Sequence, residues 1–363
     1  MAGGTTGGHV LSGLAIMLAY RDICDADVYF IGCGGSYENR LVPARGFELA
    51  TIPGAPFART ALAGKIRAVA ALTHGIVSAR QLLSARQTQL VIGVGGYASA
   101  GAVLAAQTLG IPTVIHEANV VAGLANRVVA RFADRVLIGW DEAGASFPKR
   151  AVAFTGNPVL PEIAAVSPLL RPGGEHQPVK VLVTGGSTGS TFLNNHVPEL
   201  LTALNKCGVG IEVHHQSGEQ DPEPIERAYA RAGIPACVEC FINDMVAAYR
   251  ESQFVIAAAG AVTLAELSAL GLPSLIVPIQ AAANEHQLDN AKVYVRKFGG
   301  HWVSEAEWNV NMLVSRLRTT LIDPGKLAEQ SRRLHASSRA DAAVQIVHQC
   351  ESVLCARASH FSV

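Results

Sequence analysis

Short apolar runs rich in β-branched residues alternate along this chain with longer stretches whose apolar residues recur at helical spacing. This alternation predicts strands joined by helices, which is typical of parallel α/β sheets. The expected strands are at 28–31, 89–94, 111–115, 135–139, 152–155, 179–184, 210–215, 237–239, 254–258 and 274–277. Residues 156–161 and 171–175 are rich in Pro, Gly and polar residues and interrupt the pattern. We therefore predict two α/β domains, residues 1–157 and 158–335. A final helix around 340–354 and a tail, within 336–363, are expected to pack back on the first domain.

Several predicted strands end in glycines and lead into a helix. The clearest case is Gly185–Ser190, between the strand 179–184 and a helical segment that continues from Thr191. Such a turn directs backbone N–H groups and the positive end of a helix dipole at one point, which suits a phosphate or diphosphate. An ordinary tight turn is the alternative. We favour the anion site because Gly3–Gly8 repeats the pattern near Met1.

No predicted strand precedes the glycine run Gly3–Gly8. A doubly wound sheet normally has its first strand near the middle, directly before such a loop. We therefore expect either that the fold lacks its first strand or that the start codon lies upstream.

Polar residues follow the strands of the first half at their carboxyl ends, where parallel sheets bind ligands. Tyr97, His116, Glu117 and Asn119 are the natural candidates, because they directly follow two of these strands or close them. His9 lies where the first glycine run turns into a helix. From this stretch alone, a structural role and a position facing a binding cleft are equally supported for His9.

Gly260 introduces a second turn into a helix in the second half, with Glu266 about one turn inside. An acid in this position can hold the two hydroxyls of a ribose. It can also simply interact favourably with the helix dipole, which the isolated stretch slightly favours.

Composition excludes several classes of function. The chain has 363 residues, 49% hydrophobic and 16% charged, with a formal net charge of zero, which argues against nucleic-acid binding. No apolar run reaches the length of about 20 residues that spans a membrane, and the first residues do not have the basic-then-apolar pattern expected of a secretory signal. Residues 57–86 alternate basic and apolar residues at helical spacing. They fit either a membrane-contacting surface or, more commonly, a core helix with a solvated face.

The Cys237/Cys240 pair indicates idle thiols in a reducing cytosol rather than a zinc site.

Taken together, the motifs of this chain resemble those of the MurG family. These are cytoplasmic glycosyltransferases that add N-acetylglucosamine to the lipid-linked muramyl-peptide precursor of peptidoglycan. The likeness covers nearly the whole chain, in this order: Gly7-Gly8-His9-Val10; Gly95-Gly96-Tyr97; His116-Glu117 with Asn119; Gly123–Arg127; Gly156–Val159; Gly185–Ser187 with Gly189, Leu193 and Asn194; His215–Gly218; Asn243–Met245; Gly260-Ala261 with Thr263 and Glu266; and Gln287 with Asn290-Ala291.

The resemblance implies a GT-B fold, in which two Rossmann-like domains face a cleft, here with the first strand apparently missing. It implies an inverting transfer of N-acetylglucosamine from UDP-N-acetylglucosamine to the muramyl sugar of the lipid-linked precursor, lipid I to lipid II. The second domain would bind the donor. The first would dock the lipid-linked muramyl-pentapeptide acceptor, in peripheral contact with the cytoplasmic face of the inner membrane. We expect no nucleic-acid partner and no cofactor.

The resemblance also assigns residues, position by position. Catalytic roles near the acceptor fall to His9, Tyr97, His116 and Glu117, with His9 as the candidate base. The residues expected to bind UDP-N-acetylglucosamine are Thr6, Gly7, Gly8, Asn119, Asn126, Gly186, Ser187, Gly189, Asn194, Ile242, Ala261, Thr263, Glu266 and Gln287.

Within that set, Ser187 would contact the phosphates and Glu266 the ribose hydroxyls. Gln287 and Asn119 would touch the sugar, and the uracil would lie at Phe241, Ile242 and Met245. No Asp-x-Asp motif stands near the donor loop, so we expect no metal in the chemical step.

The chain departs from the family pattern at several positions, namely Thr5, Ser12, Ala118, Leu160, Thr188, Ala258 and Ala259. Leu160 and Ala258 stand where arginines are usual. Two lost arginines near a diphosphate remove charge-assisted contacts of about 1.5–3 kcal/mol each, if they are direct. Two alternatives to the transfer above therefore stay open. One is a diverged UDP-sugar glycosyltransferase with another acceptor, and the other is a sugar-nucleotide-binding protein without turnover.

Overall fold

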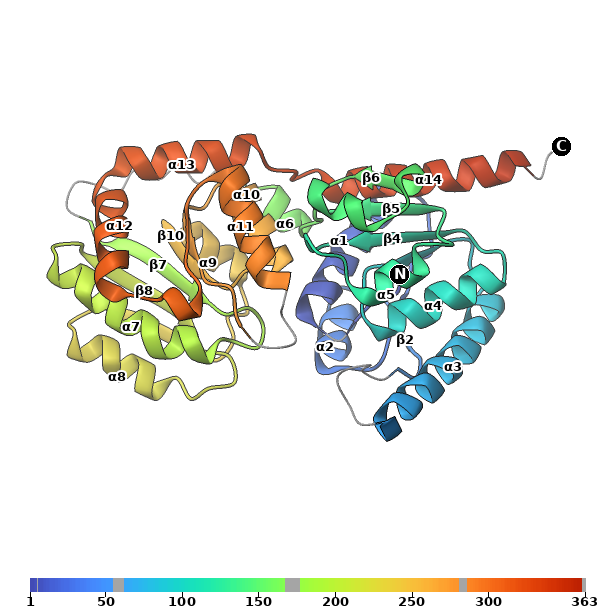
Figure 1. The fold of residues 1–363 in the computed structure, drawn as a ribbon, viewed down its shortest axis with the longest axis horizontal. Helices are drawn as coiled ribbons and strands as arrows, with labels where there is room; N and C mark the ends of the chain where they lie inside the picture. The colour runs from blue at the N-terminus through green and yellow to red at the C-terminus, as the bar shows by residue number, and fades with distance from the viewer. Residues whose placement is uncertain (5, 55–61, 167–176, 281–285, 361–363) are drawn as a thin grey trace. The chain divides into compact units, whose positions relative to one another are not determined.

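A computed structural model describes residues 1–4, 6–54, 62–166, 177–280 and 286–360 (Figure 1). The chain forms two compact units. The first contains Met1–Pro161 and Arg339–Val363, and the second contains Glu162–Ser338. Three stretches discussed above, namely residue 5, residues 57–61 and the loop at 171–175, lie outside the described residues.

The first unit is built on parallel strands. Its strands are β1 (Phe30–Gly32), β2 (Leu49–Thr51), β3 (Val91–Gly93), β4 (Thr113–Glu117), β5 (Arg135–Ile138) and β6 (Val152–Phe154). They form a β1-β2 pair and a β3-β4-β5-β6 sheet. Ala2 joins the two, because it bridges both Ile31 and Gly93 in parallel fashion. The first strand of the fold is thus reduced to one bridged residue between β1 and β3.

Helices cover these strands, with the last helix of the chain among them. The helices are α1 (Gly7–Ile23), α2 (Ser36–Ala44), α3 (Leu62–Ala85), α4 (Tyr97–Thr108), α5 (Leu124–Val129) and α14 (Ala342–His360), with short 3-10 turns at Asp141–Ser146 and Lys149–Ala151. Ile16 and Tyr20 of α1 share one buried cluster with Ile346, Val347 and Cys350 of α14. The final helix therefore completes the core of the first unit, and it extends to His360 rather than ending near residue 354.

The second unit has one six-stranded parallel sheet in the order β12-β11-β10-β7-β8-β9. Its strands are β7 (Val179–Thr184), β8 (Ile211–Gln216), β9 (Ala236–Glu239), β10 (Phe254–Ala257), β11 (Ser274–Ile276) and β12 (His301–Trp302). Its helices are α7 (Thr191–Lys206), α8 (Glu223–Arg231), α9 (Met245–Glu251), α10 (Ala261–Leu270), α11 (His286–Phe298), α12 (Val310–Ile322) and α13 (Pro324–Ala336), with a 3-10 turn at Glu305–Glu307. The short helix α6 (Pro161–Ala164) spans the junction of the two units.

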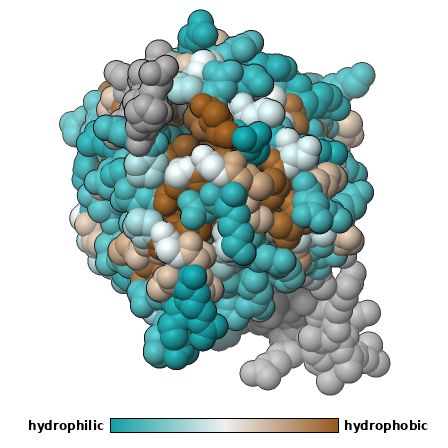
Figure 2. Space-filling model, turned by 90° about the vertical axis from the view of Figure 1, so that its left-hand side faces the viewer, coloured by the Kyte–Doolittle hydropathy of each residue, from teal (hydrophilic) through white to brown (hydrophobic). Residues whose placement is uncertain are grey.

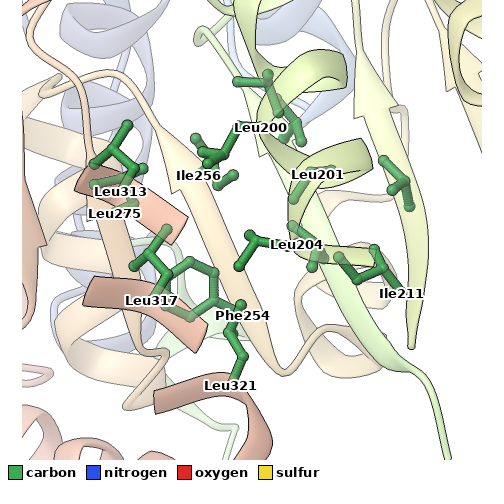
Figure 3. Packing of buried hydrophobic residues seen from close by; sticks show 14 of the residues in the cluster. Leu200, Leu201, Leu204, Ile211, Phe254, Ile256, Leu275, Leu313, Leu317 and Leu321 are labelled. Atoms are coloured by element: carbon green, nitrogen blue, oxygen red, sulfur yellow. The ribbon is translucent and has the colours of Figure 1, made fainter. Parts of the chain in front are cut away.

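A leucine-rich core covers one face of this sheet (Figure 3). Leu200, Leu201 and Leu204 recur at helical spacing on α7, so they lie on one side of that helix. They pack with Phe254 of β10 and Leu317 of α12, all five residues being almost fully buried.

On the α7, α8 and α12 side of this unit, hydrophilic residues surround a hydrophobic area (Figure 2). In the described part of the chain, no helix is long and apolar enough to cross a membrane.

Candidate functional site

His9 is positioned by the turn that starts α1. Thr6 caps the helix, since its Oγ1 accepts a hydrogen bond from the His9 backbone N–H at 3.4 Å. The ring Nδ1 of His9 lies 2.9 Å from the Gly4 carbonyl oxygen. A carbonyl can only accept, so Nδ1 carries the proton of the neutral ring and Nε2 keeps its lone pair. Within the described residues, Nε2 makes no hydrogen bond.

The surroundings of His9 keep its ring neutral. Burial lowers the pKa of His9, and the hydrogen bond to Gly4 and the negative charge of Glu117 raise it only in part. Gly95 lies so close that an added Cβ would come within 2.7 Å of Nε2. A neutral imidazole with a free lone pair, near a carboxylate that can stabilise its protonated form, has the properties of a general base.

Glu117 organises the loop after β4. Its Oε1 accepts from the backbone N–H of Asn119 at 2.9 Å and from the Asn119 side chain at 3.2 Å. Its Oε2 accepts from the Gly123 N–H at 3.0 Å and from Asn126 Nδ2 at 2.9 Å. Both oxygens of this buried carboxylate are therefore engaged within the protein, and Asn126 is buried with it.

His116 ties β4 to the segment that leaves the first unit. Its fully buried Nε2 donates to the Gly156 carbonyl at 3.1 Å. Its Nδ1 has no partner among the residues that the structure describes. Asn157 Nδ2 and Trp140 Nε1 both donate to the Ala118 carbonyl, at 2.9 and 3.0 Å. This geometry suits an anchor for the outgoing segment.

The other residues expected at the site in the first unit lie at the starts of α1 and α4. Thr6 is exposed, Gly7 is buried and Gly8 is half-buried at the start of α1. Tyr97 is the first residue of α4 and is half-buried. The structure thus gathers His9, His116 and Glu117 closely enough for their charges to affect one another, as the pKa of His116 is lowered by burial and, to a smaller extent, by His9.

The second glycine loop leaves amide groups available. The helix α7 begins at Thr191, with Ser190 as its N-cap, so Ser187 lies in the turn before the helix rather than at its first residue. The Gly186 N–H donates to Thr184 Oγ1 at 3.1 Å. The N–H groups of Ser187 and Thr188 donate to no atom of the described residues. The loop therefore offers two amides to an anion, in the turn directly before the helix.

Close contact with a second loop shapes this turn. A Cβ on Gly189 would lie 2.4 Å from the Ser217 carbonyl oxygen, and one on Gly218 would lie 2.3 Å from that of Thr188. Only residues without a side chain allow this approach. The two loops, one after β7 and one after β8, are therefore packed backbone to backbone.

Gln216 links this turn to the segment expected to hold the uracil. Its Nε2 donates to the Gly186 carbonyl at 2.7 Å, and its Oε1 accepts from the Ile242 N–H at 3.1 Å. Gln216 is buried at the end of β8. The sequence interpretation assigned it no role, although its place at the carboxyl end of a strand was a usable signal.

Asn194 belongs to a buried network beneath the turn. Its Nδ2 donates to the Ser217 carbonyl at 2.8 Å and to Gln220 Oε1. Its Oδ1 accepts from His215 Nε2 at 3.0 Å, and His215 Nδ1 lies 3.0 Å from the Tyr229 hydroxyl. Burial lowers the pKa of His215 to about 3, which keeps this ring neutral. The Asn194 side chain is thus occupied by protein partners.

Glu266 lies in the second turn of α10, whose N-cap, Gly260, offers no side chain to the first turn. Ala261 is buried and Thr263 is half-buried in that turn. The Tyr249 hydroxyl donates to Glu266 Oε2 at 2.8 Å. Burial raises the pKa of Glu266 to about 7, which the bond from Tyr249 partly opposes. The acid is therefore poised between its two protonation states near neutral pH.

Gln287 joins the ends of β10 and β11. Its Oε1 accepts from the Ala259 N–H and the Ile279 N–H, both at 3.0 Å. Asn290 Nδ2 donates to the Ala259 carbonyl at 3.2 Å. The Gln287 amide nitrogen has no partner in the described segments. The fixed oxygen therefore orients a free donor group.

The expected donor residues share one edge of a single sheet. Gly186 follows β7, Ile242 follows β9, and Glu266 and Gln287 belong to the helices that follow β10 and β11. These are the carboxyl ends of four strands of the second unit, where parallel sheets bind nucleotides. Together they form one candidate nucleotide site, and the first unit holds a separate candidate acid–base group around His9.

Two family models match this chain. The model described as the N-terminal domain of glycosyltransferase family 28 matches residues 1–138, and that of its C-terminal domain matches residues 180–346. A protein of Magnetococcus marinus is 38% identical over 350 residues, which is 96% of this chain and 95% of that protein. A protein of Xylella fastidiosa is 37% identical over 96% of this chain and 94% of its own length. Both are named UDP-N-acetylglucosamine--N-acetylmuramyl-(pentapeptide) pyrophosphoryl-undecaprenol N-acetylglucosamine transferase.

Solved structures agree. The crystal structure of Acinetobacter baumannii MurG has a TM-score of 0.75 and 28% identity, covering 97% of this chain and 98% of that one. The UDP-GlcNAc 2-epimerase of Neisseria meningitidis, solved with UDP-GlcNAc, has a TM-score of 0.65 but 14% identity, so it shows the fold alone. The fold is the GT-B fold, with two Rossmann-like α/β domains. The chain belongs to glycosyltransferase family 28 and, within it, to the MurG family of glycosyltransferases.

Proposed function

We propose that this chain transfers N-acetylglucosamine, with inversion, from UDP-N-acetylglucosamine to the muramyl sugar of the lipid-linked peptidoglycan precursor, converting lipid I to lipid II. The geometry of His9 carries the proposal: the ring is neutral, its Nδ1 is bonded to Gly4, and its Nε2 lone pair is free. The names of relatives that are 33–38% identical along almost the whole chain support the choice of substrates.

In the reaction, the acceptor hydroxyl attacks the anomeric carbon while His9 Nε2 takes its proton. The bond between that carbon and the diphosphate oxygen breaks, and UDP leaves with the bonding electron pair. The amides of Ser187 and Thr188 are fixed donors for the negative charge that grows on the diphosphate. Because they are already oriented, they need no reorganisation as the charge develops.

The remaining roles follow the contacts. We assign Glu266 to the ribose hydroxyls, the segment at Ile242 to the uracil, and the free Gln287 amide nitrogen to the sugar. Glu117 and Asn194 have side-chain partners within the protein at all of the atoms described above. We therefore infer that these two residues position the loops and act on the substrates indirectly.

Replacing Gly186 with alanine tests the diphosphate loop. Gly186 has φ +81°, and an added Cβ would meet nothing within 4 Å, so it would project into the space in front of the loop. The variant should fold, lose about 1–2 kcal/mol from left-handed backbone strain, and bind UDP-N-acetylglucosamine about tenfold more weakly by calorimetry.

Gly208 offers a matched control for this variant. It has φ +87° and equally open surroundings, but it follows α7 at the opposite end from the loop. Gly208→Ala should lose similar stability and keep donor affinity. Equal donor affinities in the two variants would contradict the proposal that the diphosphate binds at this loop.

An exposed apolar patch supports peripheral contact of the first unit with a membrane. It consists of Val121, Leu124, Val128 and Phe132, which we call the α5 patch, and Leu124 and Phe132 are 67% and 72% exposed. Arg127 and Arg131, between them in the sequence, are also exposed. Apolar side chains flanked by cations are typical of surfaces that bind anionic lipid. We propose that this patch, at the cytoplasmic face of the inner membrane, brings the enzyme to its lipid-linked acceptor.

Replacing both Leu124 and Phe132 with serine should weaken binding to vesicles that contain phosphatidylglycerol by more than about tenfold. Burying each side chain in lipid contributes about 1.5–3 kcal/mol when it is complete. Co-sedimentation measures this. Ile322→Ser is the control, because Ile322 is 48% exposed on α12 of the second unit and lies outside the patch. Equal vesicle binding by the double variant and the wild type would contradict the proposal.

Product analysis with labelled UDP-N-acetylglucosamine and a lipid-linked muramyl-pentapeptide tests the function as a whole. A β-1,4-linked disaccharide on the lipid is the expected product. Donor binding with no transfer to this acceptor would overturn the proposal. Transfer to a different acceptor would then identify a diverged glycosyltransferase, and no transfer at all would identify a sugar-nucleotide-binding protein.

A further inference from the structure

Three chemically different ligand groups converge at one edge of the second sheet. His214 lies on β8 and Cys237 on the edge strand β9, directly opposite each other in the parallel pairing, and Glu239 follows two residues later. Alternation along each strand places all three on the same side of the sheet. The neighbours Val213 and Val238 point to the other side, into the leucine-rich core. The cluster therefore lies on the face of the sheet opposite that core.

The three ligand atoms are already close together. One ring nitrogen of His214, Cys237 Sγ and a carboxylate oxygen of Glu239 all lie within 4.8 Å of one another. His214 Nε2 and Glu239 Oε1 are 2.7 Å apart. In a tetrahedral zinc site the ligand atoms are about 3.4–3.6 Å apart, given bonds of about 2.0–2.3 Å. Small side-chain rotations suffice to reach that geometry, because the strand pairing fixes the backbone.

Local charge also favours a cation here. The Glu239 carboxylate within the cluster attracts a dication, which displaces the thiol proton of Cys237 when it binds. Imidazole, thiolate and carboxylate together are ligands that zinc accepts, whereas Mg²⁺ and Ca²⁺ avoid sulfur.

We propose that His214, Cys237 and Glu239 bind one Zn²⁺ ion, with water completing a tetrahedral shell. Cys240 is not part of this site. Cys240 lies one residue beyond the end of β9, and the cluster of close ligand atoms consists of His214, Cys237 and Glu239 without it. The Cys237/Cys240 spacing is therefore incidental, and the partners of Cys237 come from its own strand and the neighbouring one.

Such an ion would fasten the edge strand directly before the donor loops. The Ser217 N–H donates to the Glu239 carbonyl at 2.8 Å, and the Gly218 N–H donates to the Cys240 carbonyl at 3.0 Å. The loop after β8, which packs against the diphosphate turn, is thus held by the backbone of Glu239, itself a proposed ligand, and of Cys240, the residue after it. We assign the ion a stabilising role, and the site stands whether or not the proposed transfer reaction is correct.

Zinc binding to the full-length, chelator-treated protein tests the proposal. Competition with a chromophoric chelator should give one Zn²⁺ per chain. Cys237→Ser should weaken binding by more than about tenfold, since even groups behind the ligands of a zinc site contribute about 10- to 100-fold. His214→Ala should do the same, and Cys240→Ser should bind as the wild type does. Co²⁺ should give a thiolate charge-transfer band in the wild type and in Cys240→Ser, and no such band in Cys237→Ser.

Thermal unfolding separates a bound ion from damage to the fold. Zn²⁺ should raise the Tm of the wild type and of Cys240→Ser, but leave that of Cys237→Ser unchanged, because only a ligand of the native state stabilises it. Glu239→Gln, which keeps the size of the side chain, should fold and bind Zn²⁺ more weakly. No saturable binding by the wild type, or equal loss in Cys240→Ser and Cys237→Ser, would overturn the site.

Discussion

Replacing His9 with alanine should lower kcat by about 100-fold or more and leave donor KM nearly unchanged, since general-base catalysis contributes about 10²–10⁴-fold. The expectation rests on the proton of His9. The Gly4 carbonyl fixes the hydrogen on Nδ1, so Nε2 is the atom that can accept a proton. Alanine removes that acceptor without touching the second unit, where we place the donor. Steady-state kinetics with both substrates varied measures the effect.

The pH profile gives a second test of His9. Burial lowers the pKa of this imidazole, so the ring stays neutral, and active as a base, at pH values below the usual range of histidine. On the acid side of the profile, the pH at which kcat falls to half its maximum should therefore lie below the ordinary histidine pKa of about 6.5. Thr6→Ala, which removes the helix cap and a 3.1 Å contact to Nδ1, is the control and should reduce kcat only mildly. A mild loss of kcat in His9→Ala would show that another residue is the general base.

Glu266→Gln should raise donor KM by about 10- to 100-fold, because a hydrogen bond to a charged group is worth about 1.5–3 kcal/mol. The ionised carboxylate can accept from both ribose hydroxyls, and its pKa of about 7 means that it is only partly ionised at neutral pH. Donor KM of the wild type should thus fall as the pH rises through about 7, whereas that of Glu266→Gln should stay flat. An unchanged KM in the variant would end the ribose assignment.

The same shift affects stability. The folded-state pKa of Glu266 is raised from 4.5 to about 7, so the folded protein holds this proton more tightly than the unfolded chain does. The free energy of unfolding, relative to that of Glu266→Gln, is therefore greatest below pH 4.5 and falls by about 3 kcal/mol as the pH rises to about 7.

Tyr249→Phe removes the hydroxyl that favours the ionised form of Glu266, so it should move the fall in donor KM to higher pH. Denaturant unfolding at several pH values checks the first of these effects, and kinetics checks the second.

The sequence pattern locates most strands to within two residues, because buried parallel strands read as continuous apolar runs. It misses β2 and β12, which are three and two residues long and only partly buried. It also sets the joint between domains at 157/158, whereas the compact units divide after Pro161. Gly156 and Pro158 interrupt regular structure, but the residues up to Pro161 still make their contacts within the first unit.

Side-chain roles are harder to predict than elements. Asn194 is predicted to bind the donor, and the structure shows its side chain bonded to Ser217 and His215, which lie 23 and 21 residues further along the chain. The helix after the second glycine loop begins at Thr191, where the sequence pattern places it, because Ser190 accepts from the Leu193 N–H and caps it. Gln216 shows the reverse case: its place at the carboxyl end of a strand was a usable signal, but the sequence does not reveal which two segments its side chain joins. Long-range hydrogen bonds of this kind become visible only in three dimensions.

The placement of α14 has a consequence for biosynthesis. Ile346 and Val347 are fully buried against α1, although a ribosome makes them after the whole of residues 162–338. The first unit can bury that surface only once its last segment emerges, whereas the second unit is continuous and can fold earlier. Folding during translation would then proceed out of chain order, with the amino-terminal part waiting for the carboxyl-terminal helix.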